Sequence, residues 1–88
     1  MDQRGMEKVL KALANKRRLA ILGYLKKNKE APVGEIAAEI HLSFKATSRH
    51  LSVLLSADVV ERDQRGLQMF YCLAKEQKPA AGRIIQLL

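Results

Sequence analysis

Apolar residues recur three and four positions apart along most of this chain, the spacing that places side chains on one side of an α-helix. The pattern predicts five helices, at about Gly5–Ala14, Lys16–Lys27, Val33–His41, Phe44–Ala57 and from Lys78 onward. Asn15 and Ser43 precede the second and fourth of these, where a short polar side chain can accept hydrogen bonds from the first backbone N–H groups. Both residues are therefore expected to be helix caps.

After Ala57 the spacing changes from helical to alternating. Asp58 lies where a left-handed residue would end the fourth helix. Val59–Arg62 and Leu67–Leu73 then have the pattern of two strands, joined by a turn over residues 63–66. The sequence thus predicts a mainly α protein with a small two-stranded hairpin. The third and fourth helices would form a helix-turn-helix and the hairpin a wing, which makes duplex DNA the first partner to consider.

The length of 88 residues allows one domain, covering positions 1–88. A chain this short buries only about 60 to 65% of the surface that its unfolded form exposes, so its own core is thin. The first and last predicted helices both carry apolar stripes, and pairing them across a two-fold axis would cover both. We therefore expect a homodimer whose interface contains Met6, Val9, Leu10, Leu13, Ile84, Ile85, Leu87 and Leu88.

The net charge is strongly positive, at +7, with 16 Lys and Arg residues against 9 Asp and Glu. Between Lys8 and Lys29 there are eight basic residues and no acidic one. We interpret Lys8, Lys11 and Lys26–Lys29 as a solvated helix face that keeps a small protein in solution. Positive charge anywhere on the surface also raises the encounter rate with a polyanion.

The sequence contains no apolar run near the roughly 20 residues that a membrane span needs, and no secretion signal at its start. Its one cysteine, Cys72, cannot form an internal disulfide, which fits a reducing interior. We expect a cytoplasmic protein. Cys72 has no positive neighbour that would lower its pKa, so we interpret it as an inert packing residue rather than a redox-active thiol.

Four separated segments, in the right order, carry a resemblance to a known family. They are LKALANKRRLAIL from Leu10, VGEIA from Val33, LSFKATSRHLSVL from Leu42 and GLQMFYCL from Gly66. Together they resemble the ArsR family of winged-helix repressors over about Lys8–Leu73. The resemblance implies a homodimer that uses its first and last helices as the interface and binds operator DNA through Phe44–Ala57.

Many members of that family sense metals, and here the chain departs from them. The positions of their paired thiolates are occupied by Pro32 and Gly34, neither of which can bind a metal ion. The last helix offers no acidic or histidine ligand beyond Glu76 at its approach. His41 and His50 are isolated, and we interpret them as capping, packing or phosphate-contacting residues. The sequence therefore predicts no metal-sensing site and no cofactor.

Helical geometry separates the two sides of the fourth helix. If Thr47, Leu51 and Leu54 face the core, the opposite side carries Phe44, Lys45, Ser48, Arg49 and Ser52. Arg49 is the leading candidate for a base contact, because Arg can bind both acceptors of guanine, although it could also be a phosphate clamp. Phe44 is expected either to touch a thymine methyl group or to fold back onto the third helix.

Three more arginines are candidates for backbone or minor-groove contacts. Arg62 and Arg65 belong to the wing, and Arg18 matches an arginine that the resembled family carries at the start of its second helix. Structural salt bridges are the alternative for all three. Where relatives have basic residues after the turn glycine, this chain has Leu67 and Gln68, so its wing should contribute less than usual.

The sequence as a whole predicts a homodimeric transcriptional regulator, a repressor that binds an inverted-repeat operator. The alternative is a winged-helix module for protein interaction that does not bind DNA specifically. Catalysis is not expected, since no spacing indicates a Ser-His-Asp, Cys-His or paired-carboxylate site and there is no Gly-rich phosphate loop.

Overall fold

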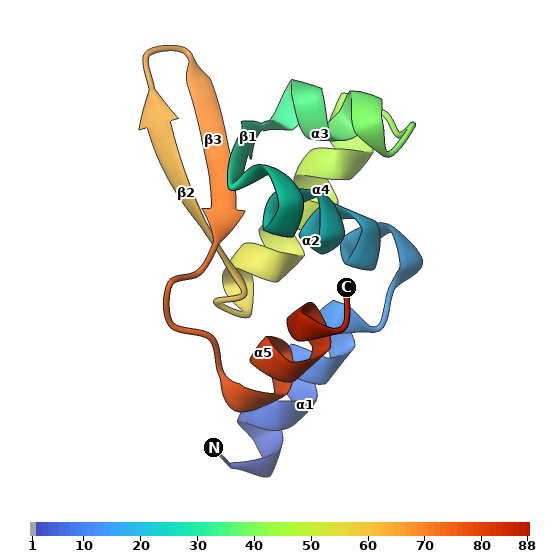
Figure 1. Ribbon diagram of the computed structural model, residues 1–88, viewed down its shortest axis with the longest axis vertical. Helices are drawn as coiled ribbons and strands as arrows, with labels where there is room; N and C mark the ends of the chain where they lie inside the picture. The colour runs from blue at the N-terminus through green and yellow to red at the C-terminus, as the bar shows by residue number, and fades with distance from the viewer. Residues whose placement is uncertain (1) are drawn as a thin grey trace.

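The protein, described here by a computed structural model of residues 2–88, has five helices and three short strands within that range (Figure 1). In chain order the elements are α1 (Gln3–Leu13), α2 (Lys16–Asn28), β1 (Glu30–Pro32), α3 (Val33–Glu39), α4 (Phe44–Ser56), β2 (Val60–Arg65), β3 (Gln68–Leu73) and α5 (Pro79–Gln86). The hairpin of β2 and β3, called the wing below, projects from one end of the molecule, and α1 lies at the other end (Figure 1). The five predicted helices are confirmed, with ends that shift by one or two residues.

The helix starts follow from local capping chemistry. The backbone N–H groups of Arg17 and Arg18 donate to the Asn15 side chain at 2.9 and 3.1 Å. The N–H of Ala46 donates to the Ser43 hydroxyl at 3.1 Å. Both expected caps are confirmed, and each satisfies N–H groups that have no partner inside the helix.

Residues with positive φ follow three of the helices: Lys29 after α2, His41 after α3 and Asp58 after α4. Asp58 has φ +61°, as predicted, and it ends α4 just before the first strand of the wing. His41 has φ +55°, which stops α3 at Glu39 rather than at the expected His41. The chain therefore turns over residues 40–43 and delivers α4 at an angle to α3.

The sheet has three strands, in the order β1-β3-β2, with both pairs antiparallel. The predicted hairpin of two strands is confirmed as β2 and β3. The prediction left out a third strand, β1, which pairs with β3 and places Ala31 opposite Tyr71. Three residues are too few to show an alternating pattern, and Pro32 argued locally against a strand. Proline is tolerated here because β1 is an edge strand.

The predicted turn over residues 63–66 was wrong. Strand β2 continues through Arg65, which pairs with Gln68, and this leaves Gly66 and Leu67 as a two-residue turn. Gly66 has φ +62°, the glycine-first pattern of the type II′ turns that match the twist of two paired strands. The polar residues that indicated a loop therefore belong to an exposed strand.

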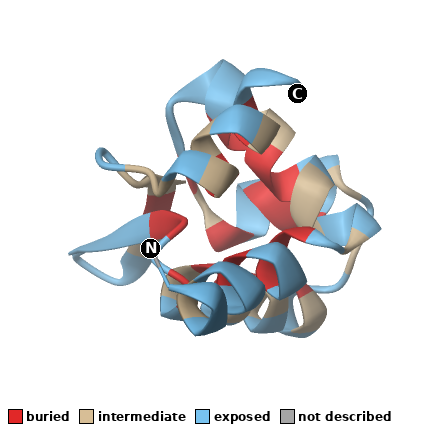
Figure 2. Ribbon diagram, turned by 90° about the horizontal axis from the view of Figure 1, so that it is seen from below, coloured by how far each residue is buried: buried red, intermediate tan, exposed pale blue. Residues whose placement is uncertain are grey.

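The core lies between α2, α4 and the inner face of the sheet, with α1 and α5 closing one end. Figure 2 shows that the buried residues gather on the inward-facing sides of the elements. Its largest fully buried side chains include Ile21, Leu22, Leu25, Ile36, Leu51 and Leu54. Thr47 is also fully buried, and its hydroxyl has no hydrogen-bond partner among residues 2–88. The same core thus fixes the inward side of α4, and with it the direction of the outward side.

Helices α1 and α5 pack against each other within one protomer. Val9, Leu13 and Ile85, three of the residues expected at a dimer interface, are buried there within one protomer and lie beneath the exposed apolar side chains. The apolar side chains that remain exposed at this end are Met6, Leu10, Leu87 and Leu88, with Ile84 partly buried.

Candidate nucleic-acid interface

Helix α4 presents a straight polar line to solvent. Lys45, Arg49 and Ser52 are exposed at intervals of four and three residues, while Ser48 beside them is partly buried. On the opposite side Thr47, Leu51 and Leu54 are completely buried, as predicted. The orientation expected from helical spacing is therefore confirmed, and the cations of this line point away from the core.

No carboxylate between residues 2 and 88 lies within 4.0 Å of the charged groups of Lys45 or Arg49. Their charge is therefore available to a polyanion without first breaking an ion pair. A guanidinium on such a helix can also donate to two acceptors of one base. Helix α4 thus has the geometry of a recognition helix.

The position of α4 is held by contacts with the two preceding helices. The Arg17 guanidinium donates to the backbone oxygen of Ile40 in the turn before α4, at 3.3 Å. The Tyr24 hydroxyl donates to the Glu35 carboxylate and so links α2 to α3; this bond raises the pKa of Tyr24 to about 12. These links hold α3 and the turn that leads into α4 against α2.

Arg18, predicted to contact DNA, connects three helices. Its Nη1 donates to the backbone oxygens of Lys11 and Ala12, at 3.1 and 3.3 Å, where α1 ends. Its Nε donates to Nδ1 of His50 in α4, at 3.3 Å. A cation at the last carbonyls of a helix is favourable, so the structure gives Arg18 a positioning role in addition to any contact with DNA.

His50 is partly buried beside this guanidinium. Burial lowers its pKa below the ordinary value, and the charges of Arg18, Arg17 and Arg49 lower that pKa further. The neutral imidazole with Nδ1 unprotonated is the form that can accept the hydrogen bond from Arg18. Of the interpretations open for His50, packing is the one that the structure shows.

Phe44 begins α4 and is 62% exposed, so its side chain is not buried against α3. It lines a hollow of about 260 Å³ together with residues at the end of β1, at the start of α3 and on the wing: Pro32, Val33, Gly34, Leu67, Gln68 and Met69. Leu67, at the tip of the wing, is fully exposed. An apolar edge therefore runs from the start of α4 toward the tip of the wing.

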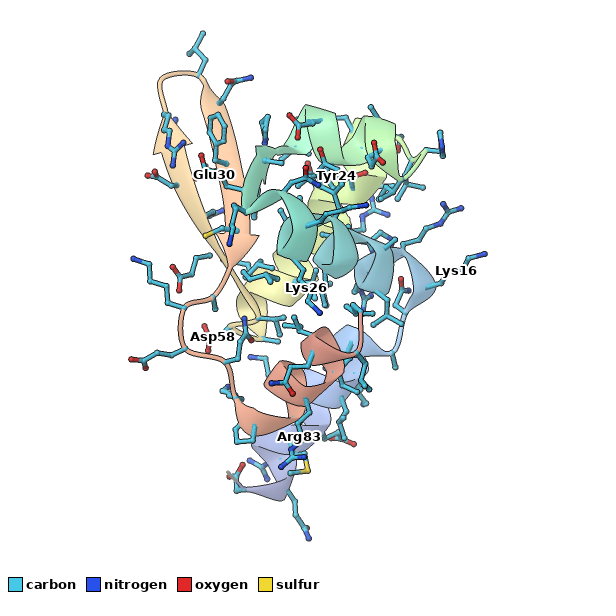
Figure 3. All side chains as sticks on the ribbon, in the orientation of Figure 1. Lys16, Tyr24, Lys26, Glu30, Asp58 and Arg83 are labelled. Atoms are coloured by element: carbon cyan, nitrogen blue, oxygen red, sulfur yellow. The ribbon has the colours of Figure 1, made fainter. Side chains whose placement is uncertain are left out.

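The wing carries a cation that is already paired. Two guanidinium nitrogens of Arg65 lie 2.6 and 2.9 Å from the two carboxylate oxygens of Glu30, and its Nε lies 2.9 Å from Asp63. The same guanidinium stacks 4.5 Å from the centre of the Phe70 ring. Figure 3 shows Glu30 on β1 beside the wing. These bonds lower the pKa of Glu30 and raise that of Arg65.

The salt-bridge alternative therefore describes Arg65, whereas Arg62 is exposed and has no ion pair within residues 2–88. Sequence reasoning missed the Glu30 partner because it is 35 positions away from Arg65. The only available signal was the strand β1, which was itself missed.

Cys72 lies in β3, where the strand register places it opposite Glu30 on one side and Glu61 on the other. Burial raises the pKa of its thiol, and these two carboxylates raise that pKa further. The reactive thiolate is therefore disfavoured. Within residues 2–88 no group of three His, Cys, Asp or Glu side chains is arranged to hold a metal ion.

The exposed recognition helix, the helix that positions it and the hairpin beside it define a winged helix-turn-helix protein, the class predicted from the sequence. The chain belongs to the arsR family of bacterial regulatory proteins, whose match covers residues 15–62. It is a transcriptional regulator with a DNA-binding fold of this family. No helix in the described part of the chain is long and apolar enough to cross a membrane.

Three relatives illustrate the similarity. The transcriptional activator HlyU of Vibrio cholerae is 39% identical over 80 residues, which are 91% of this chain and 73% of HlyU. The structure of reduced HlyU has a TM-score of 0.82 and 35% identity, covering 97% of this chain and 85% of that one.

A possible ArsR-family regulator of Mycobacterium bovis, solved as a homodimeric winged helix-turn-helix domain, has a TM-score of 0.82 and 32% identity; the match covers 96% of this chain and 74% of that one. The transcriptional repressor PagR of Bacillus anthracis has a TM-score of 0.78 and 28% identity, with coverage of 96% and 92%.

Proposed function

We propose that this protein is a homodimeric repressor that binds an inverted-repeat operator with one α4 helix in each of two successive major grooves. The observation that carries the proposal is the line of Lys45, Arg49 and Ser52, which is exposed on a helix whose other side is locked into the core. Arg49 would make the base-specific contact, and Lys45, Ser48 and Ser52 would position the helix against phosphates and base edges.

A dimer is supported by the apolar surface at the α1–α5 end. Met6 and Leu10 are 42% and 46% exposed and line a shallow hollow of about 360 Å³, and Leu87, directly after α5, is 82% exposed. Grouped apolar exposure of this kind marks an interface in a chain with a thin core. The homodimeric Mycobacterium bovis domain gives further support for a dimer of this fold.

Repression is the proposed sign of regulation because occupancy alone excludes polymerase from an operator that overlaps a promoter. The names of the relatives include both an activator and a repressor. Activation would require a second contact beyond DNA binding. Since the operator of a bacterial regulator is cytoplasmic DNA, we place the protein in the cytoplasm.

Selection of random duplexes on the purified protein, followed by sequencing, tests the proposal. We expect an inverted repeat whose half-sites are about one helical turn apart, with affinity falling steeply as salt rises. Light scattering should give the mass of a dimer. A protein-interaction module would instead enrich no sequence and show no steep dependence on salt, and that result would refute the proposal.

A further inference from the structure

A groove that is lined by four cationic residues, and whose exposed surface is mainly apolar, lies between α1 and α4. It has a volume of about 440 Å³ and is lined by Lys8, Lys11, Ala12, Arg18, Arg49, Ser52, Val53 and Ser56. Four of these residues are cations and none is acidic, although the sequence alone led us to interpret Lys8 and Lys11 as a solvated face. The fold brings both lysines beside Arg49, the leading candidate for base contact.

We propose that this groove binds the sugar-phosphate backbone of the operator, and that Lys8 and Lys11 are phosphate-contacting residues which replace the wing as the second electrostatic anchor. The inference rests on the proposed function, because it extends the DNA contact of α4. The occupant is duplex DNA because the groove continues from the exposed line of α4 and complements a polyanion in charge.

The charge that surrounds each candidate anchor supports this assignment. The wing offers Arg62 and Arg65, but Arg65 is paired with Glu30 and Asp63, and Glu61 adds a third carboxylate nearby. Among the cations that line the groove, one ion pair is found within residues 2–88: Lys11 lies 3.9 Å from Glu7, and both side chains are mostly exposed. Such a pair contributes little and is easily exchanged for a phosphate.

The geometry of α1 keeps Lys8 apart from the proposed dimer interface, whereas Lys11 also lines the hollow that Met6 and Leu10 form. Helical spacing places Lys8 about 160° around the helix from both Met6 and Leu10. Lys8 therefore belongs to the flank of α1 that meets α4, and the two apolar residues belong to the other flank. Arg18 secures the arrangement by donating to the backbone oxygens of Lys11 and Ala12 and to His50 of α4.

Because α1 also carries the proposed interface, the groove of each protomer would lie nearer the two-fold axis than its wing does. The phosphates that it contacts should therefore lie on the inner side of each half-site, toward the centre of the operator. Wing contacts should lie on the outer side. This placement gives the inference a readout that is independent of total affinity.

The test compares the double variant Lys8→Gln, Lys11→Gln with a control, Lys16→Gln, Lys27→Gln, by salt titration on the selected operator. Lys16 and Lys27 are exposed on α2 and do not line the groove, so the control removes the same charge outside it. Figure 3 shows Lys16 extending away from the body of the protein.

The groove variant should lower the slope of log affinity against log salt by about 0.9 for each phosphate that is no longer neutralised. We expect roughly two such phosphates per protomer, one for each lysine replaced. The control should leave the slope nearly unchanged. Ethylation interference should show that the inner phosphates matter for the wild type and not for the groove variant. Light scattering on both variants should give the mass of a dimer, which excludes loss of dimerisation as the cause of any change in slope.

Equal slopes for wild type and the groove variant, or an equal decrease in the control, would overturn the inference while leaving the proposed function standing. A wild-type protein that binds no duplex even at low salt would instead overturn the proposed function, and this inference with it.

Discussion

The recognition helix and the wing face the same proposed partner with opposite electrostatic designs. On α4, Lys45 and Arg49 are exposed and have no ion pair within residues 2–88. On the wing, Arg65 is held by two carboxylates and an aromatic ring, and the tip is the uncharged Leu67. Counting basic residues therefore overestimates the electrostatic contribution of the wing to DNA binding, because a cation that is already paired must first lose its partner.

The largest expected effect comes from Arg49→Ala, which removes the proposed base contact. We expect the preference for the operator over a scrambled duplex to fall by about 1 to 3 kcal/mol, on the order of tenfold to a hundredfold. Fluorescence anisotropy on the two duplexes measures this difference. The matched wing variant Arg62→Ala should weaken both duplexes about equally. Unchanged preference in Arg49→Ala would show that another residue reads the operator.

A smaller effect is expected when the partner of Arg65 is removed. Glu30→Gln takes away the bidentate carboxylate and leaves only Asp63, so the wing becomes more positive. Affinity for duplex DNA should rise a few-fold at low salt, and the difference should vanish at high salt because exposed charges are screened.

Glu76→Gln, which removes an exposed carboxylate between β3 and α5, is the control for Glu30→Gln and should change binding less. A loss of affinity in Glu30→Gln would mean that the ion pair orders the wing for binding and does not merely neutralise it.

The smallest effect concerns the pH dependence of stability and involves His50. Its pKa is lower in the folded protein than in the unfolded chain, so between those two values the unfolded state binds more protons. Its contribution is therefore fully present above about pH 6.5 and declines as the pH falls through that value toward the folded pKa. Melting curves from pH 8 to pH 5 should show this decline, on the order of a few degrees.

His50→Gln keeps an oxygen that can accept from Arg18 and removes the titrating group. This variant should lose less stability than the wild type over the same range. An identical pH profile would show that His50 is not the group responsible.

Local signals predicted the helices and the direction of α4 well. Asn15 and Ser43 act within one turn of their own positions, and the burial of Thr47, Leu51 and Leu54 follows from helical periodicity alone. The position of Asp58 was recognisable because few residue types tolerate a left-handed conformation.

The features that sequence reasoning missed depend on contacts between distant segments. β1 exists because β3 offers it an edge, and three residues carry no periodic pattern of their own. The pairing of Arg65 with Glu30 and the approach of Lys8 to Arg49 likewise require the folded arrangement. Val9, Leu13 and Ile85 were assigned to a dimer interface because spacing shows which face is apolar, but not which neighbour covers it.

Strand β1 also has a consequence for the energetics of docking. By pairing with β3, it braces the hairpin along the edge opposite β2, while the two-residue turn at Gly66 leaves little slack at the tip. A flexible hairpin would lose conformational entropy on binding a duplex, and this loss costs a free energy of about 0.5 to 1.5 kcal/mol for each side chain immobilised. A hairpin that is paired with β1 has already lost most of its conformational freedom during folding. Its rigidity can therefore favour binding even though the hairpin has little net charge.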